Sequence, residues 1–101
     1  MKKIIQRTRR FEKSFGKLNV KTQKLFIKKL GIFIEDERSP SLMTHRLKGK
    51  RADEHSFSVT DDIRAIYEKR QFKGRELIVF TFVDIGGHNR VYWLAKDLIK
   101  I

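Results

Sequence analysis

The first part of the chain has the hydrophobic pattern of one strand and two helices. Residues 2–7 place two isoleucines among polar residues, which predicts a short strand at a sheet edge. Thr8 can cap a short helix that weakens at Gly16, and Asn19 can cap a longer helix that extends to about residue 37. The apolar residues of the first helix recur at i, i+4 and i+7, namely Phe11, Phe15 and Leu18. We therefore expect an edge strand followed by a helical hairpin.

The second part changes to the period of two that is typical of strands. Residues 36–44 contain the only proline and form a polar linker that cannot continue the helix. Apolar and polar residues then alternate in two short runs, Phe57 and Val59 and then Ile63, Ala65 and Tyr67. Residues 68–75 predict a polar turn. Residues 77–83 are almost wholly apolar, as expected of a central strand covered on both faces, and Gly86 and Gly87 should stop it.

This order of elements predicts an α+β fold in a single domain, residues 1–101. The simplest architecture packs the helical hairpin against one face of a mostly antiparallel four-stranded sheet. Residues 89–101 carry apolar residues at helical spacing, so we expect a C-terminal helix or tail. The opposite face of the sheet is left free in this architecture, and a strand of nucleic acid could lie on it.

The charge of the chain restricts its partners. There are 24 Lys and Arg against 12 Asp and Glu, which gives a formal net charge of +12 at pH 7. A charge of this size favours polyanionic partners such as RNA, DNA, an acidic protein or an anionic membrane surface. No apolar run is long enough to span a bilayer and no signal-peptide core is present, so we expect a cytoplasmic protein without a membrane role. The absence of cysteine excludes thiolate metal sites and a cysteine nucleophile.

Three stretches of the chain resemble a known family. They are residues 45–50 (HRLKGK), residues 61–67 (DDIRAIY) and residues 83–92 (VDIGGHNRVY). In this order and spacing, and after a helical hairpin, they look like the signature stretches of the RelE/ParE toxin superfamily. The resemblance covers residues 2–92. It implies one RelE/ParE-like toxin domain that an acidic antitoxin protein holds in check.

The histidine after the last strand indicates the branch of that superfamily. Gly86, His88 and Tyr92 resemble the ending of YafQ-like nucleases, whose catalytic histidine occupies the place of His88. The same branch has a histidine at the place of His45 and an aspartate at the place of Asp62. The resemblance thus implies the toxin of a type II toxin-antitoxin system, a ribosome-associated endoribonuclease that cuts messenger RNA in the ribosomal A site.

One position departs from that pattern. The YafQ-like branch has a further histidine where this chain has Ser58, so the identity of the general base stays open. His55 lies on the same predicted strand, but alternation places it on the opposite face from Ser58. The departure keeps open a catalytically inactive relative that binds RNA or an antitoxin. A gyrase inhibitor of the ParE branch is a further alternative, against which His88 and Tyr92 argue.

Metal-free RNA cleavage defines the roles that these residues would take. A base removes the proton of the 2′-hydroxyl, an acid protonates the leaving 5′-oxygen, and cations stabilise the charge on phosphorus. His88 suits either proton transfer, because histidine titrates near neutral pH. His45 could be the second such group, Asp62 could orient a histidine or accept a proton, and Tyr92 could stack on a base. The candidates for RNA and phosphate binding are Lys48, Lys50, Arg51 and Arg64. No metal and no cofactor are expected.

Each of these residues also has a purely structural interpretation. His88 could be a solvated turn residue, His55 a structural or partner-facing residue, and Asp62 an ion-paired or turn-capping carboxylate. Arg64 could pair with Asp62 or another carboxylate to hold the sheet, and Tyr92 could anchor the tail in the core. The basic charge could serve the acidic antitoxin as well as RNA. We expect a monomer alone and a hetero-oligomer with the antitoxin.

Overall fold

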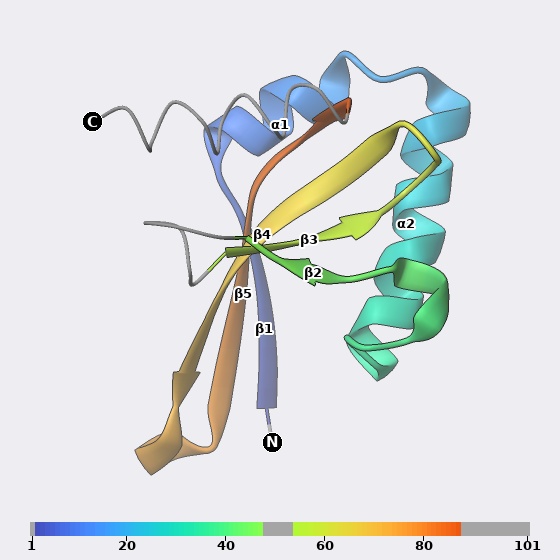
Figure 1. Cartoon of the computed structure of the whole chain (residues 1–101). Coiled ribbons are helices and arrows are strands. Elements are labelled where there is room, and N and C mark those ends of the chain that lie inside the picture. Colours follow the sequence, from blue (N-terminus) through green and yellow to red (C-terminus); the bar gives the residue numbers. More distant parts are fainter. Residues whose placement is uncertain (1, 48–53, 88–101) are drawn as a thin grey trace.

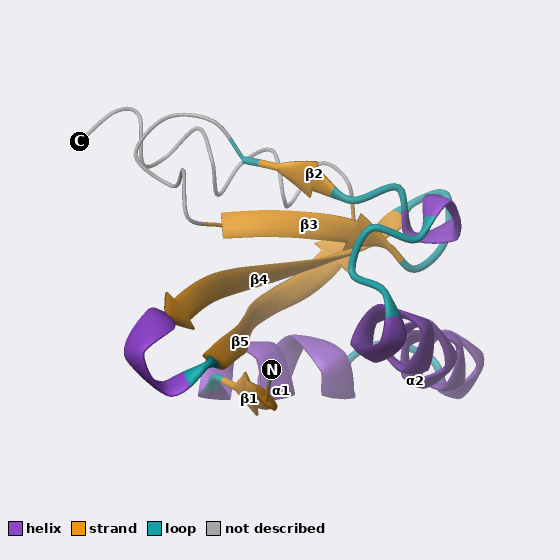
Figure 2. Cartoon of the chain, turned by 90° about the horizontal axis from the view of Figure 1, so that it is seen from below, coloured by secondary structure: helices purple, strands orange, loops and turns teal. Residues whose placement is uncertain are grey.

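A pair of helices covers one face of a five-stranded sheet (Figure 1 and Figure 2). The computed structural model describes residues 2–47 and 54–87 of the chain. The strands are β1 (Lys2–Arg7), β2 (His45–Arg46), β3 (Glu54–Ser58), β4 (Ile63–Phe72) and β5 (Leu77–Gly87). Their order in the sheet is β1-β5-β4-β3-β2, with β1 parallel to β5 and the other pairs antiparallel. The predicted α+β architecture is confirmed.

The sheet has one strand more than the four that the sequence predicted. The additional strand is β2, which has two residues and pairs His45 with Ser56 and Arg46 with His55. A strand this short has no alternation that a sequence pattern could reveal. β1 lies at the opposite edge of the sheet, as expected. β2 therefore carries His45 to the other edge, next to β3.

Both helices begin at the predicted capping residues. In α1 (Arg9–Gly16), the backbone N–H of Phe11 donates to the side-chain oxygen of Thr8 at 3.1 Å. In α2 (Val20–Glu35), the backbone N–H of Thr22 donates to the side chain of Asn19 at 2.8 Å. These bonds satisfy amide groups that have no partner inside the helix. α1 ends at its glycine as predicted, and α2 ends two residues before the predicted limit.

Aromatic rings form the contact between α2 and the sheet. Phe33 is 1% exposed, and its ring centroid lies 4.8 Å from those of Tyr67 and Phe80 and 5.2 Å from that of Phe57. These three partners belong to β4, β5 and β3, so one helical side chain contacts three strands. The cluster continues toward α1 through three more rings, Phe11, Phe26 and Phe82. This core holds the helical hairpin on one face of the sheet.

β4 and β5 extend beyond the limits that the sequence pattern predicted. Residues 68–72, expected in a polar turn, remain paired with β5, and Gly86 and Gly87, expected to stop β5, remain paired with β4. The pairing is continuous apart from one irregularity between Ile66 and Tyr67. A polar hairpin and a paired glycine both lack the apolar alternation on which the prediction depended. The limits that the sequence pattern predicted for β4 and β5 were therefore wrong at both ends of this hairpin.

The face of the sheet away from the helices is partly buried, contrary to the expectation that it is free. Ser56, Ile66 and Asp84 lie on this face, in register with one another across β3, β4 and β5. They are 2%, 0% and 2% exposed. Gln6 and Arg70, on the same face, are exposed. A strand pattern distinguishes the two faces of a sheet but does not reveal what covers each of them.

The segment 89–101, for which the sequence predicts a helix or tail, lies outside the described residues. α2 is the longest helix in the described ranges, with 16 residues. Neither α2 nor any other helix in these ranges is long and apolar enough to cross a membrane.

Replacing Phe33 with alanine should remove the ring that joins α2 to three strands. Such a change at a buried aromatic residue costs about 3 to 5 kcal/mol of the free energy of unfolding. We expect a loss of this size for Phe33→Ala in urea denaturation followed by circular dichroism. Phe72→Ala is the matched control, because Phe72 is 45% exposed at the end of β4. Equal losses in the two variants would contradict this description of the core.

Candidate functional site

Arg64 lies on the sheet face away from the helices, and three hydrogen bonds fix its guanidinium. Its Nε donates to the Ser56 hydroxyl at 3.0 Å. Its Nη2 donates to the carbonyl of Met43 at 2.8 Å and to the carbonyl of Ser56 at 3.2 Å. Arg64 belongs to β4, Ser56 to β3, and Met43 to the segment that leads into β2. Three parts of the chain therefore hold one planar cation in one orientation.

The guanidinium of Arg64 is half-buried without a carboxylate beside it. Burial disfavours the charged form and lowers the pKa of Arg64 from its ordinary value. Arginine nevertheless stays protonated in proteins. Among the described residues, no carboxylate lies within ion-pair distance of Arg64, and none accepts a hydrogen bond from its Nη1. The predicted alternative in which Arg64 pairs with Asp62 is therefore wrong. An oriented and partly desolvated cation of this kind suits an anion such as phosphate.

His45 shares the face of Arg64 at the edge of the sheet. It is exposed at the start of β2 and pairs with Ser56, the residue whose hydroxyl accepts from Arg64. Side chains of directly paired residues lie on the same face of a sheet. Because β3 lies between β2 and β4, the backbones of β2 and β4 are about 10 Å apart, which is two strand spacings. The structure thus places His45 and Arg64, two of the predicted site residues, on the same face of the sheet.

Asp62 lies in the turn between β3 and β4, next to Arg64 in the chain. Its backbone N–H donates to the Thr60 hydroxyl at 3.2 Å, and that hydroxyl also accepts from the backbone N–H of Ile63 at 2.9 Å. Thr60 therefore caps the turn. The carboxylate of Asp62 is exposed and forms no ion pair with any residue in the described ranges. The described residues therefore do not support the interpretation of Asp62 as an ion-paired or turn-capping carboxylate.

The end of β5 lies beside the Asp62 turn. Gly87 pairs with Ile63, and a Cβ atom added at Gly87 would lie 4.0 Å from the backbone oxygen of Asp62. The last described residue before position 88 is therefore adjacent to Asp62. The other predicted site residues lie outside the described residues, namely Lys48, Lys50, Arg51, His88 and Tyr92.

Ser58 stands where the YafQ-like pattern has a histidine. It pairs directly with Arg64, and its hydroxyl donates to the carbonyl of Thr60 at 2.8 Å. A serine hydroxyl does not accept a proton near neutral pH as a histidine does. His55 does not replace the missing histidine, because it lies on the other face, where its ring stacks on Tyr67 at 5.4 Å. The predicted separation of His55 from Ser58 is confirmed.

A second group of titratable residues lies on the helix-covered side. The Tyr67 hydroxyl and Lys69 Nζ each donate to the carboxylate of Glu37 at 2.7 Å. Burial favours a raised pKa for Glu37, but the hydrogen bonds from Lys69 and Tyr67 outweigh it and lower the pKa. Burial and the neighbouring Glu37 raise the pKa of Tyr67. The group ties the segment after α2 to β4. Neither it nor any other set in the described ranges gathers three His, Cys, Asp or Glu side chains as a metal site would.

Sequence reasoning missed three residues that shape this region. In the sequence pattern Ser56 is only a polar residue of an alternating strand, and Met43 contributes a backbone carbonyl, which no side-chain pattern reveals. Asp84 is 2% exposed, and its Oδ2 lies 3.3 Å from Nε of Arg10, so it ties α1 to the sheet. The signal for Asp84 was present, since a carboxylate buried within an apolar strand needs a cationic or hydrogen-bonding partner.

Comparisons with known proteins find similarity in structure. No protein-family model and no curated protein matches the sequence. A YoeB/ParE toxin from Agrobacterium tumefaciens matches 87% of this chain and 99% of its own, with a TM-score of 0.67 and 13% identity. For a chain of the E. coli DinJ-YafQ toxin-antitoxin complex, the match covers 91% of this chain and 99% of that one, with a TM-score of 0.66 and 15% identity. For a chain of the archaeal RelE-RelB complex from Pyrococcus horikoshii OT3, it covers 89% of this chain and 99% of that one, with a TM-score of 0.64 and 15% identity. The chain therefore has the RelE/ParE-like fold.

The lowered pKa of Glu37 predicts a loss of stability in acid. A carboxylate whose pKa is lowered by folding contributes stability above the pKa of the unfolded chain, and the contribution disappears as pH falls through the folded pKa. We expect Glu37→Gln to be less stable than wild type by about 1 to 3 kcal/mol near neutral pH. The difference should shrink below about pH 4 in thermal unfolding. Glu35→Gln, at the exposed end of α2, is the control. A pH-independent difference for Glu37→Gln would overturn this assignment.

Proposed function

We propose that this chain is the toxin of a type II toxin-antitoxin system and that it cleaves messenger RNA in the ribosomal A site. The observation that carries the proposal is the oriented guanidinium of Arg64, which faces no carboxylate in the described ranges and shares a sheet face with His45. The fold supports it, because YafQ and RelE chains with antitoxin partners have the same fold. The charge of +12 supports an anionic substrate.

The proposed reaction breaks one phosphodiester bond by internal attack. A base takes the proton of the 2′-hydroxyl, the 2′-oxygen bonds to phosphorus, and the bond from phosphorus to the 5′-oxygen breaks as an acid protonates that oxygen. The products are a 2′,3′-cyclic phosphate and a 5′-hydroxyl. We assign the proton transfers to His88 and His45. Arg64 stabilises the charge that develops on the phosphoryl oxygens.

The remaining candidates take supporting roles in this proposal. Asp62 orients a histidine, since the residue is exposed and its backbone oxygen lies beside Gly87 at the end of β5. Tyr92 stacks on a base of the message. The backbone N–H of Leu47 donates to the carbonyl of Glu54 at 2.8 Å, so the intervening segment begins and ends at the edge that carries His45. That segment supplies the proposed phosphate contacts, Lys48, Lys50 and Arg51.

The first prediction of this proposal concerns the product in cells. Brief expression of the wild type should create new 5′ ends in a translated message, and these ends should follow its codon phase. A copy of the message whose start codon is removed should show no new 5′ ends. His88→Ala should abolish these ends. His55→Ala is the matched histidine control, because His55 stacks on Tyr67 on the opposite face, and it should still cleave.

The same experiment separates the alternatives. Toxicity without new RNA ends, together with inhibited supercoiling by gyrase, would replace the proposal with a ParE-like gyrase inhibitor. Wild-type protein that is neither toxic nor able to cut RNA would identify an inactive relative that binds RNA or an antitoxin. Cleavage of a substrate without a 2′-hydroxyl would contradict the proposed reaction.

The second prediction isolates the cation that carries the proposal. Arg64→Gln should lower the rate of RNA cleavage by roughly 10²-fold or more, the effect of losing one transition-state donor. Arg70→Gln removes the same charge from the same strand. Arg70 is exposed and paired with Glu68 at 2.7 Å, so this control should cleave at nearly the wild-type rate. Equal losses in the two variants would mean that only net charge matters and would refute a role for the Arg64 geometry.

A further inference from the structure

The carbonyl that holds Arg64 belongs to a residue with an unusual backbone conformation. Met43, whose carbonyl accepts from Nη2 of Arg64 at 2.8 Å, has a φ of 48° and a ψ of 51°, which is the left-handed region. Residues other than glycine rarely adopt this region, because the Cβ atom then crowds the backbone. The side chain of Met43 is 59% exposed, so its own burial does not hold this conformation. The neighbours of Met43 in the chain therefore have to hold it.

Both neighbours of Met43 are fixed. Leu42, on one side, is 0% exposed and belongs to the core. On the other side, the hydroxyl of Thr44 donates to the backbone carbonyl of Glu37 at 2.9 Å. This bond closes the loop 37–44, and Met43 lies directly before the residue that closes it.

Glu37 joins this loop to the strand that carries Arg64. Its carboxylate accepts hydrogen bonds of 2.7 Å from the Tyr67 hydroxyl and from Lys69 Nζ, both of β4. Arg64 lies on the same strand, three residues before Tyr67. The side chain of Glu37 is thus bound to β4, while its backbone carbonyl is bound to Thr44. One residue therefore links the strand of the guanidinium to the closed loop.

The link connects the two sides of the sheet. On the helix side, the ring of Tyr67 packs against Phe33, with 4.8 Å between the ring centroids. On the other side, Nε of Arg64 donates to the Ser56 hydroxyl. Figure 2 shows the loop 37–44 running from the end of α2, on the helix side, to the edge strand β2. Contacts made on the helix side can therefore determine where a carbonyl lies on the other side.

We propose that Glu37 and Thr44 are positioning residues for Arg64. The bonds to β4 fix the start of the loop, and the bond from Thr44 to Glu37 fixes its end. Met43 is held between these fixed points and directs its carbonyl to Nη2 of Arg64. Neither Glu37 nor Thr44 is a catalytic residue, because each acts on the guanidinium through Met43. Only the expected effect on RNA cleavage rests on the proposed function.

Two substitutions at Thr44 test the link without any RNA. Thr44→Val keeps the shape of the side chain and removes the hydroxyl, whereas Thr44→Ser keeps the hydroxyl. In the wild type, the hydrogen bonds of Arg64 should keep its Nη1 and Nη2 groups in separate ¹⁵N NMR signals. The rotation that exchanges these groups should be roughly ten-fold faster in Thr44→Val, the effect of one hydrogen bond to a charged group. It should keep the wild-type rate in Thr44→Ser. An unchanged rate in Thr44→Val would refute the proposal.

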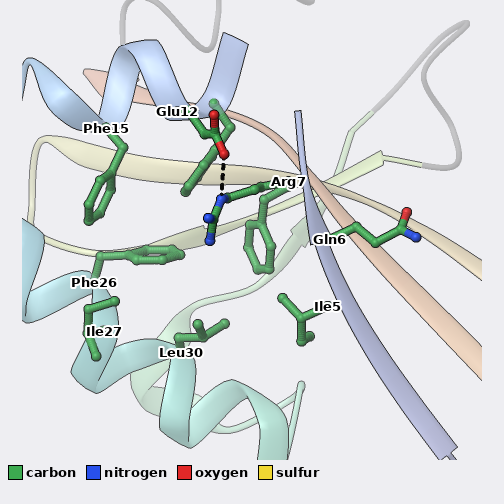
Figure 3. Close-up of a pocket in the computed structure, with 10 residues that line it drawn as sticks. Ile5, Gln6, Arg7, Glu12, Phe15, Phe26, Ile27 and Leu30 are labelled. Atoms are coloured by element: carbon green, nitrogen blue, oxygen red, sulfur yellow. Dashed lines mark hydrogen bonds and ion pairs between the residues drawn. The ribbon is translucent and has the colours of Figure 1, made fainter. Parts of the chain in front are cut away.

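A second pair of substitutions tests the carboxylate. Glu37→Gln weakens the link to β4 and should speed the same rotation of Arg64. Glu12→Gln is the matched control, because Glu12 also lies 2.7 Å from a cation, Arg7, but beside the apolar cavity between β1, α1 and α2 (Figure 3). It should leave the Arg64 signals at their wild-type values. The signals report on the folded protein, so a lower melting temperature of Glu37→Gln does not move them by itself. Equal changes in the two variants would contradict a specific role for Glu37.

RNA cleavage gives the functional readout of the same link. Thr44→Val should lower kcat and kcat/KM equally, by roughly ten-fold, because an oriented cation is lost from the transition state alone. Thr44→Ser should cleave at nearly the wild-type rate. A lower melting temperature of Thr44→Val with an unchanged kcat would mean that the hydroxyl is only structural and would overturn the proposal.

The two readouts fail independently of each other. If the wild type cuts no RNA but Thr44→Val still frees the Arg64 guanidinium, the positioning stands and the nuclease function fails. If the wild type cuts RNA and Thr44→Val changes neither the signals nor kcat, the nuclease function stands and the positioning is overturned. Slower cleavage by Thr44→Val with unchanged Arg64 signals would also overturn it, because the hydroxyl would then act without Arg64.

Discussion

The contact of Phe33 with rings from three strands is the interaction on which the rest of the structure depends. It holds α2 against β3, β4 and β5 and so selects the face of the sheet that becomes the core. Because side chains alternate along a strand, a slip of one residue would exchange the two faces. The aromatic residues therefore also decide that Ser56 and Arg64 lie together on the opposite face. The position of the candidate site is a consequence of the core.

Arg64 differs from Lys69 and Arg10, which each face a carboxylate, in what surrounds it. Lys69 faces the carboxylate of Glu37, and Arg10 faces that of Asp84. These pairs neutralise the cation and leave little attraction for a further anion. Arg64 is held by a hydroxyl and two carbonyls, which fix its orientation without cancelling its charge. The neutral acceptors around Arg64 therefore leave its charge available to an anion, which the carboxylates beside Lys69 and Arg10 do not.

The sequence predicted the parts of the fold that depend on local chemistry. The capping residues Thr8 and Asn19 and the change of period after α2 follow from neighbouring positions alone. The length of the β4–β5 hairpin and the burial of Ile66 depend on residues far away in the chain. The surroundings of Arg64 could not be predicted either, because a carbonyl such as that of Met43 leaves no mark on the sequence.

The two faces of the sheet impose a limit on how an acidic partner could inhibit the site. Arg7 pairs with Phe82, Phe82 pairs with Tyr67, and Tyr67 is three residues from Arg64. Two strand spacings and three residues along a strand amount to about 14 Å between the Arg7 and Arg64 backbones. Because the buried core lies between these positions, a side chain bound on the helix side cannot contact Arg64 across the sheet. If the proposed function holds, inhibition by an acidic partner requires a segment that reaches the Arg64 face itself.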